Sequence, residues 1–85
     1  MLEPQKGAIA LCSTGRKGLI TAETADVDGI WHGLHIGPEH IGKPWQSKNP
    51  KVVQQTTPRS FRALMSMLKR AQALRAPRKP KSTNA

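Results

Sequence analysis

The spacing of apolar residues changes near Thr57, and this change limits the folds that the chain can adopt. Before Thr57 the apolar residues alternate with a period of two, which is the period of side chains along a pleated strand. After Thr57 they recur every three or four residues, as they do along one face of an α-helix. The sequence therefore predicts a mainly β fold of about five short strands over residues 6–53 and one amphipathic helix over residues 58–75.

Residues 6–22, KGAIALCSTGRKGLITA, have the pattern of a β-hairpin. Apolar residues alternate on each side of the turn-forming sequence S-T-G-R-K-G. Gly15 and Gly18 favour a tight reversal, because glycine adopts positive φ without a Cβ clash. We expect this reversal to present Arg16 and Lys17 at its tip. A two-stranded hairpin is not stable alone, so the rest of the chain must add strands or cover one face.

Residues 30–36, IWHGLHI, form a third candidate strand. The strand period places His32 and His35 on opposite faces, so H-x-x-H is not a chelating pair here, and we expect neither a metal nor a cofactor. Trp31 lies on the same face as His35. It either offers a stacking surface for a base or packs beneath a neighbouring loop.

Residues 37–51 are expected to be mostly loop, because two glycines and three prolines interrupt them. Pro44 lacks the amide donor that a central strand needs, so we expect a strand to resume only at residues 51–53. Trp45 is expected to cover one end of the β domain rather than to stand free. Ser47 is expected to be exposed in the closing turn.

The helix is predicted from its cap and from its apolar stripe. Thr57 fits an N-cap and Pro58 fits the first helical position, where its missing amide does no harm. The stripe consists of Phe61, Leu64, Met65, Leu68 and Ala71, widened by Met67 and Leu74. Such a helix packs on the β domain, lies on an anionic membrane surface or docks in a partner groove. The remaining segments are expected to be a flexible N-terminus (1–5), a polar linker (54–57) and a disordered basic tail (76–85).

Two resemblances add to this interpretation. The lysine-glycine opening, the alternating strand, the basic Gly-rich turn and the following Gly-Leu-Ile-Thr resemble the start of a KOW motif, found in ribosomal proteins and transcription elongation factors. This resemblance implies a small SH3-like barrel that contacts RNA or the machines that handle it. Residues 7–53, with GIWHGLHIG followed by IGKPWQSKNPKVV, resemble small uncharacterised proteins of actinobacterial phages. The second resemblance implies a phage origin and no known activity.

The charge is distributed unevenly along the chain. Residues 1–42 hold three Lys or Arg and five acids, whereas residues 43–85 hold eleven Lys or Arg and no acid. The positive electrostatic field of the second half favours a polyanionic partner such as nucleic acid. The single cysteine, Cys12, excludes an internal disulfide and suits a reducing compartment. No apolar run is long enough to span a membrane and the N-terminus has no apolar signal segment, so we expect a cytoplasmic location, in the host if the protein is phage-encoded.

These observations lead to a functional prediction. The acidic run ETADVDG (residues 23–29) is expected to be a solvated loop between the second and third strands. Outside this loop the sequence shows no paired carboxylates, and it shows neither a phosphate-binding glycine motif nor an activated nucleophile, so we do not expect an enzyme. We expect a small basic protein that binds RNA or DNA or joins a nucleoprotein complex. The alternative is an interaction module for an acidic host or virion protein. The residues expected to contact nucleic acid are Arg16, Lys17, Trp31, Lys43, Lys48, Lys51, Arg59, Arg62, Lys69, Arg70, Arg78, Lys79 and Lys81.

Overall fold

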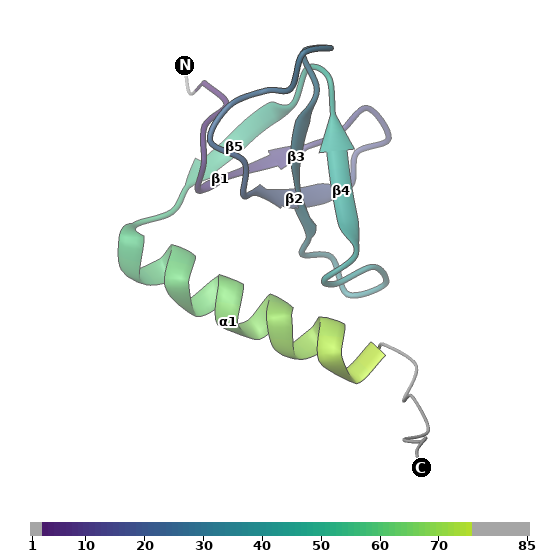
Figure 1. The fold of residues 1–85 in the computed structure, drawn as a ribbon, viewed down its shortest axis with the longest axis vertical. Coiled ribbons are helices and arrows are strands. Elements are labelled where there is room, and N and C mark those ends of the chain that lie inside the picture. Colours follow the sequence, from purple (N-terminus) through teal and green to yellow (C-terminus); the bar gives the residue numbers. More distant parts are fainter. Residues whose placement is uncertain (1–2, 76–85) are drawn as a thin grey trace.

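The computed structural model describes residues 3–75, which form one antiparallel sheet followed by one helix (Figure 1). The elements are β1 (Ala8–Leu11), β2 (Lys17–Ile20), β3 (Trp31–His35), β4 (Pro44–Ser47), β5 (Lys51–Gln55) and α1 (Pro58–Arg75). The strand order is β4-β3-β2-β1-β5, so β4 and β5 are the edge strands. The predicted mainly β fold of five short strands and a C-terminal helix is confirmed. The predicted basic tail, with Arg78, Lys79 and Lys81, lies outside the described residues.

Alternate side chains of the sheet enter two apolar clusters. The inner cluster consists of Ala8, Ala10, Ile20 and Trp45, with Cys12, Trp31 and Val52 packed against it. Every strand contributes to this cluster, and Figure 1 shows β1 and β5 crossing the direction of β3 and β4, so the sheet curves around it. This curvature is compatible with a barrel-like fold.

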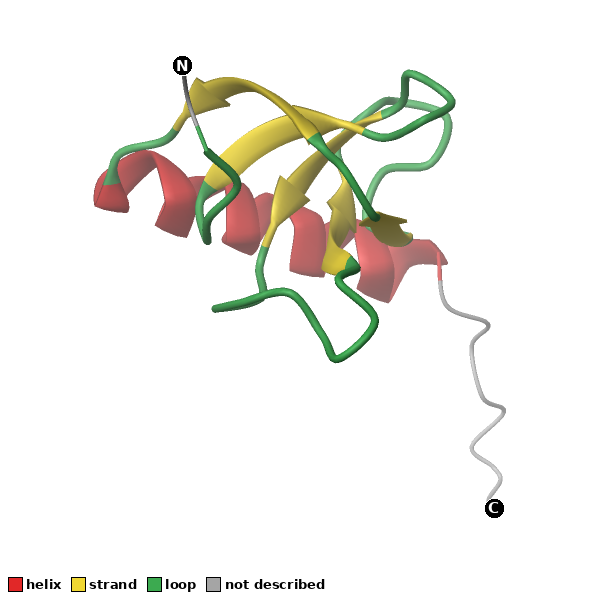
Figure 2. Ribbon diagram, turned by 90° about the horizontal axis from the view of Figure 1, so that it is seen from above, coloured by secondary structure: helices red, strands yellow, loops and turns green. Residues whose placement is uncertain are grey.

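The opposite face of the sheet is covered by α1, which runs along it (Figure 2). The helix-side cluster consists of Ile9, Leu19 and Leu68, with Leu34, Ile36, Ile41, Phe61, Leu64 and Met65 packed against it. Leu68 is fully buried. Of the placements that the sequence allows for the helix, the structure therefore shows packing on the sheet. No helix within residues 3–75 combines the length and the apolar character needed to cross a membrane.

The helix begins and ends at the predicted residues, but its buried stripe is narrower than predicted. The amide of Ser60 donates to Thr57 Oγ1 over 3.1 Å, which confirms Thr57 as the N-cap. Met67 and Leu74 are 44% and 80% exposed, so the prediction that they widen the stripe is wrong. Met67 and Leu74 lie about 100° and 120° around the helix axis from the fully buried Leu68, so they point away from the sheet.

Proline caused an error in the predicted strands. Pro44 begins β4, a strand that the sequence interpretation assigned to loop. Proline is tolerated there because β4 is an edge strand and Pro44 is its first residue, where no amide is needed. The alternation of β4 buries Trp45, as predicted, and also buries Ser47, which was wrongly expected to be exposed.

The predicted linker and turn also need correction. Strand β5 continues to Gln55, because Ala8 pairs with Gln55 across the sheet, so the linker is shorter than residues 54–57. The tip of the β1–β2 turn is Ser13–Gly15 rather than Arg16 and Lys17. The amide of Gly15 donates to Cys12 O over 2.8 Å, and the φ of Gly15 is +82° as the turn requires.

Asp26 organises the acidic loop between β2 and β3. Its Oδ1 accepts hydrogen bonds from the amides of Asp28 (2.8 Å) and Ile30 (2.9 Å), and its Oδ2 lies 2.8 Å from His32 Nε2. These contacts, with the His32 hydrogen bond first, lower the pKa of the Asp26 carboxyl from its usual 3.8. The prediction of a solvated loop holds for its exposure but missed this internal scaffold.

We predict that the thermal stability of Asp26→Asn depends less on pH in the acid range than the thermal stability of the wild type. A carboxyl whose pKa is lowered by folding contributes stability above its unfolded pKa, near 3.8, and loses it as pH falls through the lower folded pKa. Asparagine keeps the Oδ1 acceptor but not the charge. Thermal midpoints between about pH 2 and pH 6 should therefore change less in this variant than in the wild type. Asp28→Asn, which removes a charge from the same loop without touching these contacts, should keep the wild-type profile, and an unchanged Asp26→Asn profile would contradict the assignment.

Candidate nucleic-acid interface

The register of the sheet aligns basic residues that are far apart in sequence. Leu11 of β1 pairs with Lys17 of β2 on one side and with Lys51 of β5 on the other. Directly paired residues of neighbouring strands project from the same face, so Lys17 and Lys51 flank Leu11 in one row. The amide of Ile36 donates to Lys17 O over 3.1 Å, so the residue that follows β3 lies beside Lys17.

A cationic notch lies where this row meets the β3–β4 loop. We define the notch by Arg16, Lys17, His35, His40 and Lys43. The loop folds back on β3, since the amide of Gly42 donates to His35 O (2.9 Å) and the amide of His35 donates to Lys43 O (2.8 Å). The fold-back places the imidazole rings of His35 and His40 with their centroids 5.2 Å apart.

Two adjoining depressions open at the notch. One, of about 200 Å³, is lined by Arg16, Lys17, His35 and His40, with Gly37, Pro38 and Glu39 completing it. The other, of about 230 Å³, is lined by Cys12, Arg16, His35 and Trp45 among others. Arg16 and His35 belong to both depressions, so these two side chains stand between them. The Arg16 backbone is fixed there, because Trp45 Nε1 donates to Arg16 O over 3.0 Å.

The electrostatics of the notch act on His35. Burial lowers the pKa of the His35 imidazole below its usual 6.5, and the nearby charges of His40, Arg16 and Lys43 lower that pKa further. Most of the acids lie elsewhere. Glu23, Asp26 and Asp28 belong to the loop that precedes β3, whereas the notch follows β3. Strand β3 therefore separates a cationic end from an acidic loop.

The other predicted contact residues are spread over the surface. Arg59, Arg62, Lys69 and Arg70 are exposed on α1, and Lys48 is exposed in the turn between β4 and β5. Trp31 is half-buried against the inner cluster and pairs with Ser47, at the opposite end of β3 from His35. The structure therefore places Arg16 and Lys43 beside His35, with Lys17 lining the same depression. Lys51 lies in the row of Leu11, on the other face of the sheet from His35, and Trp31 lies apart from the notch.

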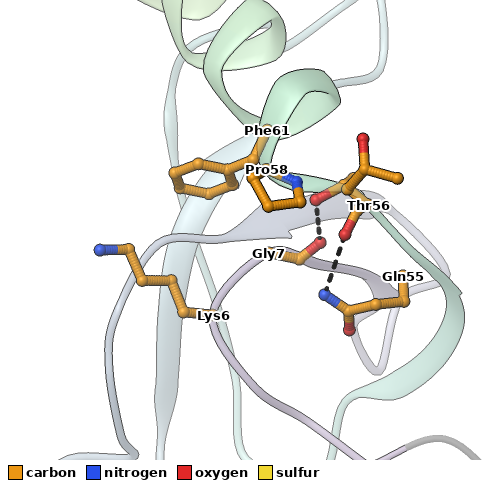
Figure 3. Close-up of a pocket in the computed structure, with 7 residues that line it drawn as sticks. Lys6, Gly7, Gln55, Thr56, Pro58 and Phe61 are labelled. Carbon is orange, nitrogen blue, oxygen red and sulfur yellow. Dashed lines mark hydrogen bonds between the residues drawn. The ribbon is translucent and has the colours of Figure 1, made fainter.

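A further depression, of about 330 Å³, lies where β5 leads into α1 (Figure 3). Thr56 donates to Gly7 O from both its amide (3.0 Å) and its hydroxyl (2.7 Å), and Gln55 Nε2 donates to Thr56 O. The ammonium of Lys6 lies 5.7 Å from the centre of the Phe61 ring. The two hydrogen bonds of Thr56 hold the residues before the helix against Gly7, which precedes β1, so we interpret this depression as a structural joint.

Sequence reasoning missed three residues of the interface. The sequence prediction gave no contact role to His35, His40 or Arg75. Arg75 Nη2 donates to Ile41 O (2.9 Å) and Gln72 Nε2 donates to Gly42 O (2.8 Å), which joins the end of α1 to the β3–β4 loop. A signal was available for the histidines, since both flank a Gly-Pro turn that reverses the chain.

Within residues 3–75, no three His, Cys, Asp or Glu side chains are grouped closely enough to hold a metal ion. The notch is thus defined by its positive charge and by the depressions that open at it. Comparisons of the chain with protein-family models, with curated proteins and with solved structures find no match.

Proposed function

We propose that this chain is a small, non-enzymatic protein that binds nucleic acid or joins a nucleoprotein complex. The observation that carries the proposal is the convergence of Arg16 and Lys43 on His35, with Lys17 lining the same depression as Arg16. Like-charged side chains repel one another, so a cluster of them with few acids nearby favours a polyanion that neutralises it. Phosphate groups match guanidinium and ammonium donors in charge and in geometry.

The exposed cations of α1 support the same proposal. Arg59, Arg62, Lys69 and Arg70 are exposed, and the contacts of Gln72 and Arg75 attach the last turns of the helix to the loop that carries Lys43. Backbone phosphates of one strand could thus be met by the notch and the helix together. The proposed SH3-like or KOW-like identity and the phage origin rest on the sequence resemblances alone.

We predict that the affinity for short RNA or DNA falls steeply with salt. Phosphate contacts release counterions, so log K should fall linearly with log salt, with a slope of about −0.9 per phosphate contact on duplex DNA and about −0.7 on single strands. Arg16→Glu or Lys43→Glu should weaken binding regardless of sequence and flatten the slope. Fluorescence anisotropy of labelled oligonucleotides at several salt concentrations measures both quantities.

Lys6→Glu is the matched control for these substitutions, because it makes the same change in net charge elsewhere. Lys6 pairs with Glu23 at 2.9 Å, at the other end of β2 from the notch, and both side chains are exposed. Such exposed pairs contribute little to stability. Equal weakening by Lys6→Glu and Arg16→Glu would show that only overall charge matters. No binding even at low salt would overturn the proposal.

A second candidate function is favoured by the outer side of α1. Ala63, Ser66, Met67 and Arg70 line a shallow groove there, and Leu74 is 80% exposed. Apolar side chains beside a guanidinium suit an acidic protein partner better than they suit a phosphate backbone. If nucleic acid does not bind at low salt, an interaction module for an acidic host or virion protein becomes the leading proposal.

A further inference from the structure

The notch contains two histidines whose ring nitrogens are not committed elsewhere. Within residues 3–75, no hydrogen bond engages the ring nitrogens of His35 or His40, whereas His32 is held by Asp26. The backbone of the loop that carries His40 is already satisfied internally, through His40 N to Gly37 O (3.1 Å) and Lys43 N to His40 O (2.9 Å). The two rings are therefore positioned by the backbone and keep their nitrogens available as donors.

The surroundings of His35 oppose its protonation in the free protein. Arg16 acts on it from the β1–β2 turn, and His40 and Lys43 act on it from the β3–β4 loop, while Lys17 of β2 lines the same depression. Glu39 is the single carboxylate among the residues that line the two depressions, and its side chain is exposed; the Cys12 thiol lines the second depression. Burial, followed by the charges of His40, Arg16 and Lys43, lowers the pKa of His35. An anion in the notch would reverse this effect, because it attracts the proton that the cations repel.

Building on the proposed function, we propose that the notch binds a nucleic-acid phosphate and that His35 takes up a proton as it does so, which makes binding stronger at lower pH. A phosphodiester is ionised throughout the relevant range, so the titrating groups belong to the protein. Arg16 supplies a planar pair of donors and Lys43 a point charge. Once protonated, the His35 imidazole adds a charged donor that the neutral ring lacks.

The direction of the effect follows from linkage. The pKa of His35 in the free protein lies below 6.5, and bound phosphate raises it. Affinity should therefore rise as pH falls through the bound-state pKa, and should level off below the free-state pKa. For each proton taken up, the change inside this window is at most about tenfold per pH unit. Above the window, only the permanent cations should bind.

The experiment measures the affinity for a labelled oligothymidylate between about pH 5 and pH 8 at constant ionic strength. Neither thymine nor the phosphodiester titrates in this range. We expect the wild-type affinity to increase severalfold toward acid. His35→Gln should reduce the slope, whereas His32→Gln, which changes a histidine near the other end of β3, should keep it. In the wild-type protein, NMR titration of the imidazole Cε1 protons should show the His35 pKa rising when unlabelled oligonucleotide is added.

The possible outcomes separate the two proposals. Binding with a pH-independent affinity, or a His35 pKa that the oligonucleotide does not raise, would overturn the histidine proposal and leave the proposed function standing. No binding at any pH would overturn both. Because the NMR measurement uses the wild-type chain, a variant that fails to fold does not prevent the test.

Discussion

Gly33→Ala is expected to unfold the β domain. A Cβ built at Gly33 would overlap the carbonyl oxygen of Leu19 and would lie 2.9 Å from the Cα of Ile20, in the neighbouring strand. These are backbone atoms at the centre of the sheet, where Gly33 pairs with both Ile20 and Trp45, and they cannot rotate away as a side chain can. Overpacking commonly lowers the free energy of unfolding by about 1 to 3 kcal/mol. Because the clash here is with backbone atoms, we expect a loss of about 3 kcal/mol or more.

The expected loss is comparable to the whole stability of such a domain. A single core in a chain below about 80 residues rarely supplies more than about 3 to 5 kcal/mol. Circular dichroism and the dispersion of amide NMR signals should therefore show an unfolded or partly folded Gly33→Ala protein. Gly37→Ala is the matched control, since nothing lies within 4 Å of the added Cβ and the backbone there does not require positive φ. Equal thermal midpoints for the two variants would contradict the proposed close contact.

Leu68→Ala is expected to destabilise the protein by about 2 to 5 kcal/mol, because it leaves a cavity between α1 and the sheet. Leu68 is fully buried and is the single helix residue at the centre of the helix-side cluster, where it packs with Ile9 and Leu19. Urea denaturation should show a lower midpoint. A loss of this size approaches the stability of the whole domain, so the variant is expected to be largely unfolded at physiological temperature.

Leu74→Ala is the control for this prediction, because it removes the same side chain from the same helix at an 80% exposed position. Surface substitutions of this kind usually change stability by less than about 0.5 kcal/mol. If Leu68→Ala and Leu74→Ala had the same small effect, the helix would not be part of the folding core.

The sequence was sufficient to predict the elements whose signals are local. The helix from Pro58 to Arg75 follows from its period and from the Thr57 cap, and both are properties of neighbouring residues. The facing of the residues in β1 and β2 likewise follows from alternation alone. Strand β4 was missed because the cost of Pro44 depends on its position in the sheet, at the start of an edge strand, which alternation does not reveal.

Gly18 shows the same limit at a single residue. It was predicted to serve the turn, but it lies buried in β2 directly against the indole of Trp45, where an added Cβ would overlap the ring. A glycine needed for space and a glycine needed for positive φ look identical in sequence. The notch is missed for a related reason, because it needs the β1–β2 turn to meet a loop more than twenty residues later.

The β3–β4 loop serves two neighbours at once. It supplies His40 and Lys43 to the notch, and the carbonyls of Ile41 and Gly42 accept hydrogen bonds from Arg75 and Gln72. Helix ends open more readily than strands in the middle of a sheet. When the last turn of α1 frays, the loop loses these two donors while the sheet stays folded. The loop then keeps its backbone hydrogen bonds to His35 but is no longer attached to the helix, so fraying of α1 gives the β3–β4 loop more freedom of movement than the sheet has.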